Sequence, residues 1–198
     1  FIQVNPVNPQ QNTKVIHLRQ AGYIYTRPDF EPQILVNDVI LFHDGVLMYC
    51  DSAYLNEKEN SFEAFGRIKV DQGDTLFMYG DYLFYDGNQK LLMVRNNVRL
   101  ENNDVTLFTD SLDYDRVLNI GYYFEGGMMV DSLNELTSYW GQYEPNIKIA
   151  TFSDSVKLVN DRFTLYSDTL VYDTETKIST ILGPSTIVSD SGVIYTKR

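Results

Sequence analysis

The chain repeats itself with a period of about 29–30 residues, and a repeat of this length limits the folds open to it. Three stretches, MYGDYLFYDG, LFTDSLDYDR and LYSDTLVYDT, share an aspartate at the fourth position, and MYCDSAYLNE precedes them. Two weaker copies replace the aspartate and bring the total to six. Such a period indicates one supersecondary unit per repeat, stacked on its neighbours. The six anchor positions are, in order, Ala21, Asp51, Asp81, Asp110, Tyr139 and Asp168.

Each repeat has the pattern of β-structure. The anchors lie in alternating stretches rich in Tyr and Phe, which favour strands, and polar or Gly-containing clusters such as DGNQ and DTET follow them as turns. A second apolar motif follows most anchors at a fixed distance, as in RIKV, NVRL and SVKL. No segment shows a helical period. A propeller blade needs about 40 residues, so the pattern favours an all-β, solenoid-like stack of about six repeats.

The aspartate in each strand needs an explanation. A strict alternation would place Tyr79, Asp81, Leu83 and Tyr85 on one face, among aromatic neighbours. An unpaired buried carboxylate is costly. Three interpretations remain: aspartates at strand bends that accept backbone N–H bonds, stacked carboxylates around a cation such as Ca²⁺, or partial protonation. In each case we expect the anchor residues to form one line across the repeats. The line consists of Asp51, Asp81, Asp110 and Asp168, and Tyr139 completes it.

Composition excludes several classes of function. A net charge of −11 and a pI near 4.5 argue against nucleic acid as a partner. Cys50 is the only cysteine, so an intrachain disulfide is excluded, and no apolar run is long enough to span a membrane. The two histidines, His17 and His43, belong to no known catalytic motif. The sequence therefore predicts no catalytic residues, no cofactor and no metal site.

The repeat resembles the OstA-like, or LptA-like, family of lipopolysaccharide-transport periplasmic proteins. The resemblance is carried by HDGVLMYCDSAYLNEKENSFEAFGRIKV, GDTLFMYGDYLFYDG, NNVRLENNDVTLFTDSLDYD and DSVKLVNDRFTLYSDTLVYD, and it covers residues 34–198. The Tyr-rich composition, with GYYFEGG, is similar to the Bacteroidetes-type branch. The resemblance implies an open, twisted β-jellyroll whose apolar interior accepts lipid A acyl chains. It also implies a periplasmic location, with any signal peptide removed.

This resemblance sets the expected domain organisation and function. We expect residues 1–13 to form an extended arm and residues 14–198 to form a single OstA-like β-jellyroll domain, cut within its last repeat. The expected role is a bridge that carries lipopolysaccharide towards the outer membrane, with other envelope transport proteins, or further copies of the chain, as partners through edge-strand pairing. Two alternatives stay open: a scaffold of the same fold that binds proteins by its edge strands, and a carbohydrate-active β-solenoid. The first predicts a filled interior, and the second predicts an outward aromatic groove.

The inner alternating positions are the expected lipid contacts. They are the apolar residues that share one side of each anchor strand under strict alternation. These residues are Tyr79, Leu83, Tyr85, Phe108, Leu112, Tyr114, Tyr166, Leu170 and Tyr172.

Overall fold

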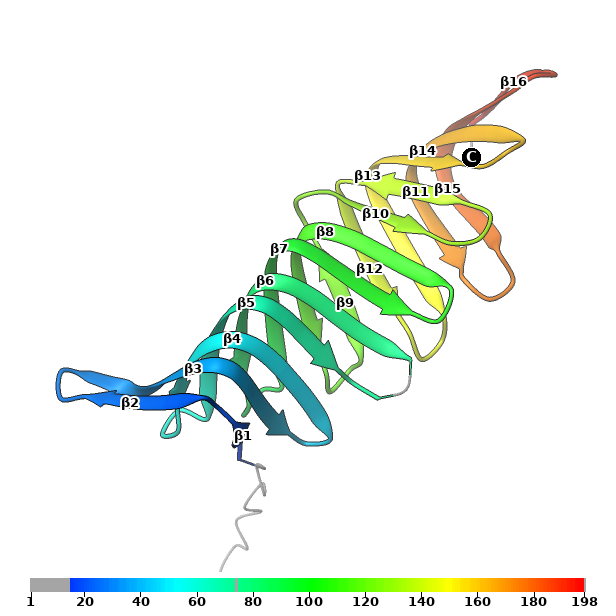
Figure 1. Cartoon of the computed structure of the whole chain (residues 1–198). Helices are drawn as coiled ribbons and strands as arrows, with labels where there is room; N and C mark the ends of the chain where they lie inside the picture. The colour runs from blue at the N-terminus through cyan, green and yellow to red at the C-terminus, as the bar shows by residue number, and fades with distance from the viewer. Residues whose placement is uncertain (1–14, 74, 198) are drawn as a thin grey trace, which may run out of the picture.

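The chain folds into one antiparallel sheet whose strands stack along a single axis. The computed structural model describes residues 15–73 and 75–197, and Figure 1 shows the strands following one another from the N-terminal to the C-terminal end. The 16 strands found in these described residues all belong to this sheet. The described residues contain no helix, and therefore no helix that could cross a membrane. The all-β prediction is confirmed, and the predicted arm over residues 1–13 lies outside the described residues.

The strands are connected largely in sequence order, as a meander. Their bounds are β1 (His17–Gln20), β2 (Tyr23–Arg27), β3 (Phe30–His43), β4 (Val46–Asn56), β5 (Ser61–Asp71), β6 (Leu76–Asp86), β7 (Leu91–Asn102), β8 (Val105–Asp115), β9 (Ile120–Tyr123), β10 (Gly127–Val130), β11 (Glu135–Ser138), β12 (Trp140–Glu144), β13 (Ile149–Val159), β14 (Phe163–Asp173), β15 (Ile178–Ser189) and β16 (Gly192–Thr196).

The predicted repeats appear as rungs of two strands each. Some rungs contain an interrupted strand, because β1 and β2 pair with the two halves of β3, and β9 and β10 pair with the two halves of β8. Likewise β11 and β12 pair with the two halves of β13. Each short pair therefore takes the place of one long strand broken in the middle. The stack of about six repeats is confirmed.

The long strands bend near their midpoints, which divides the sheet into two walls. In β3, β5, β7 and β13 the bend consists of two successive residues with positive φ, and the register shifts at the same place. Asn, Asp and Gly tolerate this left-handed conformation best, and they supply most of the positions. These pairs are Asn37–Asp38, Gly66–Arg67, Asn96–Asn97 and Asp154–Ser155.

At one bend, the side chain of a neighbouring strand lies close against the backbone. At Gly66, where φ is +73°, an added Cβ would lie 2.4 Å from Oδ2 of Asp51. Glycine is therefore required there both by its backbone conformation and by the aspartate on the adjacent strand. Each apolar motif seen in the sequence starts with the last residue of a bend, and its next residue, Ile68, Val98 or Val156, is buried.

The inner faces of the two walls pack against each other to form one hydrophobic core. This core runs from Ile16 to Tyr172, and Ile181 and Ile187 pack against its C-terminal part. Most of its side chains are almost completely buried. The interior is thus filled by the chain's own residues over most of its length, with edge strands at each end of the stack.

Candidate lipid-binding interior

A row of four tyrosines occupies one wall of the interior at a constant spacing. Tyr85, Tyr114, Tyr143 and Tyr172 lie at equal intervals along the sequence, one in each successive repeat, and all are no more than 1% exposed. Each lies near the end of a strand, next to the turn that follows. Their rings form part of the core, and their hydroxyl groups must find polar partners because a buried hydroxyl without one is costly.

The first two hydroxyl groups find these partners on neighbouring turns. The Tyr85 hydroxyl lies 2.7 Å from Nδ1 of His43 and accepts a bond of 2.6 Å from Nη1 of Arg116. The Tyr114 hydroxyl donates to Oδ1 of Asn119 over 2.5 Å. His43 ends β3, on the opposite wall from the turn that holds Arg116. Tyr85 therefore connects the edges of the two walls that lie away from the bends, where the strands end in turns.

The other two tyrosines repeat the arrangement. The Tyr143 hydroxyl donates to Oδ1 of Asn102 over 2.8 Å, and Asn102 ends β7 on the other wall. The Tyr172 hydroxyl accepts from Nδ2 of Asn134 over 2.8 Å and donates to Asp131. Burial raises the pKa of all four tyrosines in the row. They stay neutral hydrogen-bonding groups at physiological pH.

Ion pairs hold the same two edges together. Nζ of Lys90 lies 2.5 Å from Oδ2 of Asp44, and Nζ of Lys177 lies 2.8 Å from Asp104 and 3.2 Å from Asp131. Each pair joins a turn of one wall to a turn of the other. Polar contacts therefore connect the two walls along the mouth between them.

Asp131 is the most buried carboxylate of this set, with 1% of its side chain exposed. Burial opposes its ionisation, but hydrogen bonds from Tyr172, from two backbone N–H groups and from Lys177 outweigh that effect and lower its pKa. The carboxylate stays charged, because several donors stabilise it.

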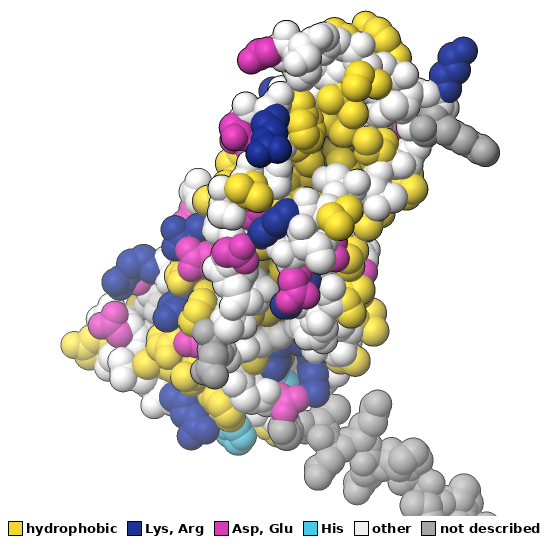
Figure 2. All heavy atoms as spheres, turned by 90° about the vertical axis from the view of Figure 1, so that its right-hand side faces the viewer, with side chains coloured by type: hydrophobic (Ala, Val, Ile, Leu, Met, Phe, Trp, Pro, Cys, Tyr) yellow, Lys and Arg dark blue, Asp and Glu magenta, His cyan; other side chains and the backbone are white. Residues whose placement is uncertain are grey.

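The interior opens at the C-terminal end of the stack. A cavity of about 490 Å³ lies there, lined by apolar and polar residues. Figure 2 shows hydrophobic side chains gathered over this end of the molecule, where the surface is hollowed. This cavity borders the hydrophobic core, because Leu158 and Leu165 belong to both. The apolar lining consists of Leu133, Leu158, Phe163, Leu165, Ile181 and Ile187.

The structure places six of the nine expected lipid contacts inside. They share the wall that carries the tyrosine row, and contact of any of them with lipid stays a prediction. These six residues follow the bend of their strands and are fully buried: Leu83, Tyr85, Leu112, Tyr114, Leu170 and Tyr172.

The remaining three lie on the outer face, so the expectation of one inner face for all nine is wrong. Phe108 is 39% exposed, Tyr166 is 47% exposed and Tyr79 is half-buried. The reason is the bend: in β6 the inward positions include Met78 before it but Leu83 after it. A strict period of two does not continue through a register shift.

The same shift explains the aspartates. Asp51, Asp81, Asp110 and Asp168 each lie where the pairing of their strand is interrupted, and Tyr139 occupies the corresponding break between β11 and β12. None of the four aspartates is buried.

Their partners favour the interpretation of aspartates at bends. Asp51 pairs with Arg67, and Asp110 accepts a bond of 3.1 Å from the backbone N–H of Asn97. The described residues contain no group of three or more His, Cys, Asp or Glu side chains that could hold a metal ion.

Two features of the interior were not predicted from the sequence. Tyr143 was not among the expected lining residues, although it follows Tyr114 at the same interval at which Tyr114 follows Tyr85. The cavity residues Ile181 and Ile187 lie in the strand after Asp168, where the second apolar motif, STIV, comes later after its anchor than RIKV, NVRL and SVKL do. The constant spacing of the tyrosines would have been the stronger signal.

Known proteins resemble this chain to different degrees. No curated protein matches the sequence. The structure of LptH from Pseudomonas aeruginosa, described as the LptA-homologous periplasmic component of the lipopolysaccharide transport device, is 17% identical and aligns over 69% of this chain and 80% of its own, with a TM-score of 0.29. The model of the OstA-like proteins matches residues 12–168, which is more than half of the chain. The chain therefore belongs to the OstA-like protein family.

Proposed function

We propose that the chain is a periplasmic component of lipopolysaccharide transport, which receives the acyl chains of lipid A at the C-terminal end of its interior. Membership of the OstA-like family supports the transport role. The role is one of binding and transfer, without catalysis.

The open C-terminal cavity is the observation that carries the proposal. Its apolar lining joins the core, so an acyl chain that enters it leaves water without breaking the contacts of the mouth. Each CH₂ group buried in this way contributes about 0.8 kcal/mol. An acyl chain of about ten buried carbons would then gain about 8 kcal/mol before ordering costs.

Access further along the interior requires the walls to separate. The inner residues of the central rungs are already in contact with one another, as their near-zero exposure indicates. An acyl chain can pass Tyr143 or Tyr114 only if these rings move. The proposal therefore predicts that lipid binds at the C-terminal rungs first.

The filled interior also favours a second candidate function. A scaffold of the same fold would need no lipid site and would bind envelope proteins through its edge strands. Unpaired strand edges of this kind accept an added strand. Apolar residues are exposed at both ends of the stack: Tyr23, Ile24, Tyr25, Val193, Ile194 and Tyr195.

Photo-crosslinking tests the two functions against each other. A photoreactive amino acid at Ile187 would lie in the cavity, whereas one at Tyr139 would lie at an outer bend that is 59% exposed. If the proposal holds, irradiation in a Gram-negative envelope gives a lipopolysaccharide adduct at Ile187 and none at Tyr139. A scaffold would give no lipid adduct at either position.

A further inference from the structure

An outer face of the sheet carries a row in which aromatic and cationic side chains alternate. The strand register pairs Tyr49 with Lys69, Lys69 with Tyr79, Tyr79 with Arg99, and Arg99 with Phe108. The Arg99 guanidinium lies 4.4 Å from the centre of the Tyr79 ring, and Nζ of Lys69 lies 5.6 Å from that of Tyr49. These stacked contacts fix the orientation of flexible side chains.

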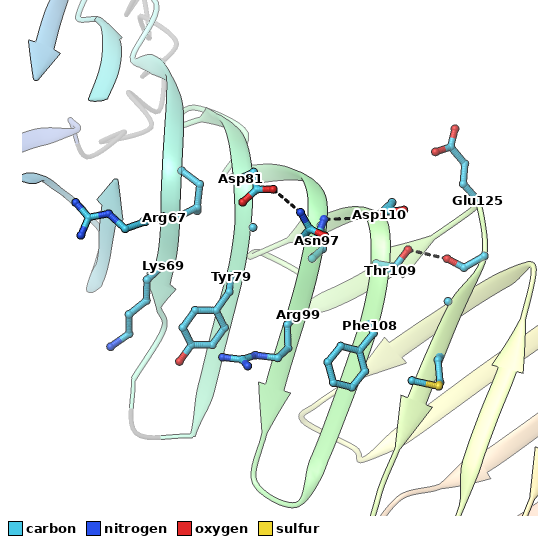
Figure 3. A pocket seen from close by; sticks show the side chains of 16 residues that line it. Arg67, Lys69, Tyr79, Asp81, Asn97, Arg99, Phe108, Thr109, Asp110 and Glu125 are labelled. Atoms are coloured by element: carbon cyan, nitrogen blue, oxygen red, sulfur yellow. Dashed lines mark hydrogen bonds between the residues drawn. The ribbon is translucent and has the colours of Figure 1, made fainter. Parts of the chain in front are cut away.

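A groove of about 870 Å³ runs beside this row. Figure 3 shows Lys69, Tyr79, Arg99 and Phe108 side by side on successive strands. The opposite bank of the groove follows the bends of the same strands. We call the groove between these two banks the outer groove. The polar side chains of its second bank are Arg67, Asp81, Asn97, Asp110 and Glu125.

The groove ends where two short strands, β9 and β10, take the place of one long strand beside β8. Between β9 and β10 the chain passes through Gly126, which has φ of +94° and would meet nothing within 4 Å if it carried a Cβ. The Thr109 hydroxyl donates to the Gly126 carbonyl over 2.7 Å and holds this segment in place. The backbone of Gly126 therefore lines the end of the groove. Because this residue has no side chain, the space beside it stays open.

The polar bank is held in place by its own hydrogen bonds. Nδ2 of Asn97 donates to Oδ2 of Asp81 over 2.6 Å, and the backbone N–H of Asn97 donates to Oδ1 of Asp110 over 3.1 Å. An ionised carboxylate has about four lone-pair sites, so these bonds leave acceptor capacity on both aspartates. The groove thus offers oriented acceptors opposite flat aromatic rings.

The charges of the groove cancel. Its cations, on Arg67, Lys69 and Arg99, stand against an equal number of anions, on Asp81, Asp110 and Glu125. A polyanion would gain little net attraction from such a site, and the chain as a whole carries −11. A neutral ligand that is rich in hydroxyl groups fits both the charges and the aromatic surface.

We propose that the outer groove binds a neutral oligosaccharide. Tyr79 and Phe108 would stack on the C–H faces of sugar rings, and Asp81, Asp110 and Asn97 would hydrogen-bond to the hydroxyl groups. This site is separate from the interior that the proposed transport function uses, so it stands or fails independently of that function. The sugar chain can come from a lipid-linked glycan or from a free polysaccharide, because the chemistry is the same.

A glycan array followed by calorimetric titration tests the proposal. The array should contain neutral and anionic oligosaccharides, and the neutral ones should include uncharged, lipid-free sugar chains released from lipopolysaccharide as well as neutral glucans. We expect at least one neutral oligosaccharide to bind. Binding of only the released chains would assign the lipid-linked source, and binding of glucans as well would assign a general sugar site.

Matched variants localise the binding. Phe108→Ala should weaken the affinity by about tenfold or more, which corresponds to about 1.4 kcal/mol or more, because aromatic side chains at the centre of a binding site contribute much of the affinity. Tyr166→Ala is the control, because Tyr166 lies on an outer face, is exposed to a similar degree and is absent from the groove lining. Circular dichroism should show both variants folded. The proposal fails if no sugar binds, if only polyanions bind, or if Tyr166→Ala weakens binding as much as Phe108→Ala.

Discussion

The hydrogen bond between Tyr143 and Asn102 gives a direct test of whether the tyrosine row holds the two walls together. Tyr143 is 1% exposed and Asn102 is 6% exposed, and the hydroxyl and Oδ1 are 2.8 Å apart. Tyr143→Phe keeps the ring in the core and removes only the hydroxyl. It leaves the Asn102 oxygen buried without this donor. We expect a loss of about 1–2 kcal/mol in the free energy of unfolding.

Urea unfolding followed by far-UV circular dichroism measures this loss, and a thermal melt checks it. For a chain of this size each kcal/mol lowers the melting temperature by about 2–4 °C, so Tyr143→Phe should melt about 2–8 °C below the parent. The matched control is Tyr166→Phe, at a residue that is 47% exposed on the outer face. Its effect should stay within about 0.5 kcal/mol.

A double-mutant cycle with Asn102→Ala separates the bond from other effects. Asn102 also donates to the Thr75 carbonyl over 3.2 Å, so Asn102→Ala alone should cost more than Tyr143→Phe alone. If the two groups act as a pair, their coupling energy is at least about 0.5 kcal/mol. A Tyr143→Phe variant as stable as the parent, or a coupling energy near zero, would refute the role given to the tyrosine row.

Three further predictions follow from the bends, the mouth and the edges. Asp110→Ala should cost about 0.5–1.5 kcal/mol because it removes the bond from the Asn97 backbone, whereas Asp168→Ala should be nearly neutral; equal losses in urea unfolding would contradict this. Asp131 has a lowered pKa, so its stabilising contribution is present above its ordinary value of 3.8 and is lost as pH falls through the lower folded value. Asp131→Asn should therefore lower the urea midpoint at neutral pH and flatten its dependence on pH in the acid range, and an unchanged acid profile would count against the contacts of Asp131. Finally, the exposed strand edges should let copies pair, so light scattering should show mass rising with concentration, and a monomer at millimolar protein would contradict edge pairing.

Much of the fold could be predicted from the sequence because the same local pattern recurs in each of the repeats. Alternation in each anchor stretch predicted the strands, and turn chemistry predicted their ends. The recurring tyrosines placed Tyr85, Tyr114 and Tyr172 in the core. Local signals of this kind are short-range, so they can be read without knowledge of what packs against them.

The bends were harder to predict, although their signals are present. Pairs such as Asn96–Asn97 are typical of left-handed backbone, but a pair of polar residues within an apolar strand also fits a simple exposed position. The shift of register at each bend reverses which residues face inward, and this moved Tyr79, Phe108 and Tyr166 to the outside. Contacts across the mouth, such as that of Lys177 with Asp104, join residues distant in the sequence and leave no local pattern.

The transport role is tested most directly by what the protein carries. The chain would be purified from a Gram-negative envelope without detergent, and its organic extract would be analysed by mass spectrometry beside that of a variant with Ile187→Glu. Ile187 lines the C-terminal cavity, and a charge there would oppose an acyl chain. We expect lipid A species at near-stoichiometric amounts with the parent chain and a strong reduction with the folded variant. Extracts without acylated lipid, or equal amounts from both proteins, would contradict it.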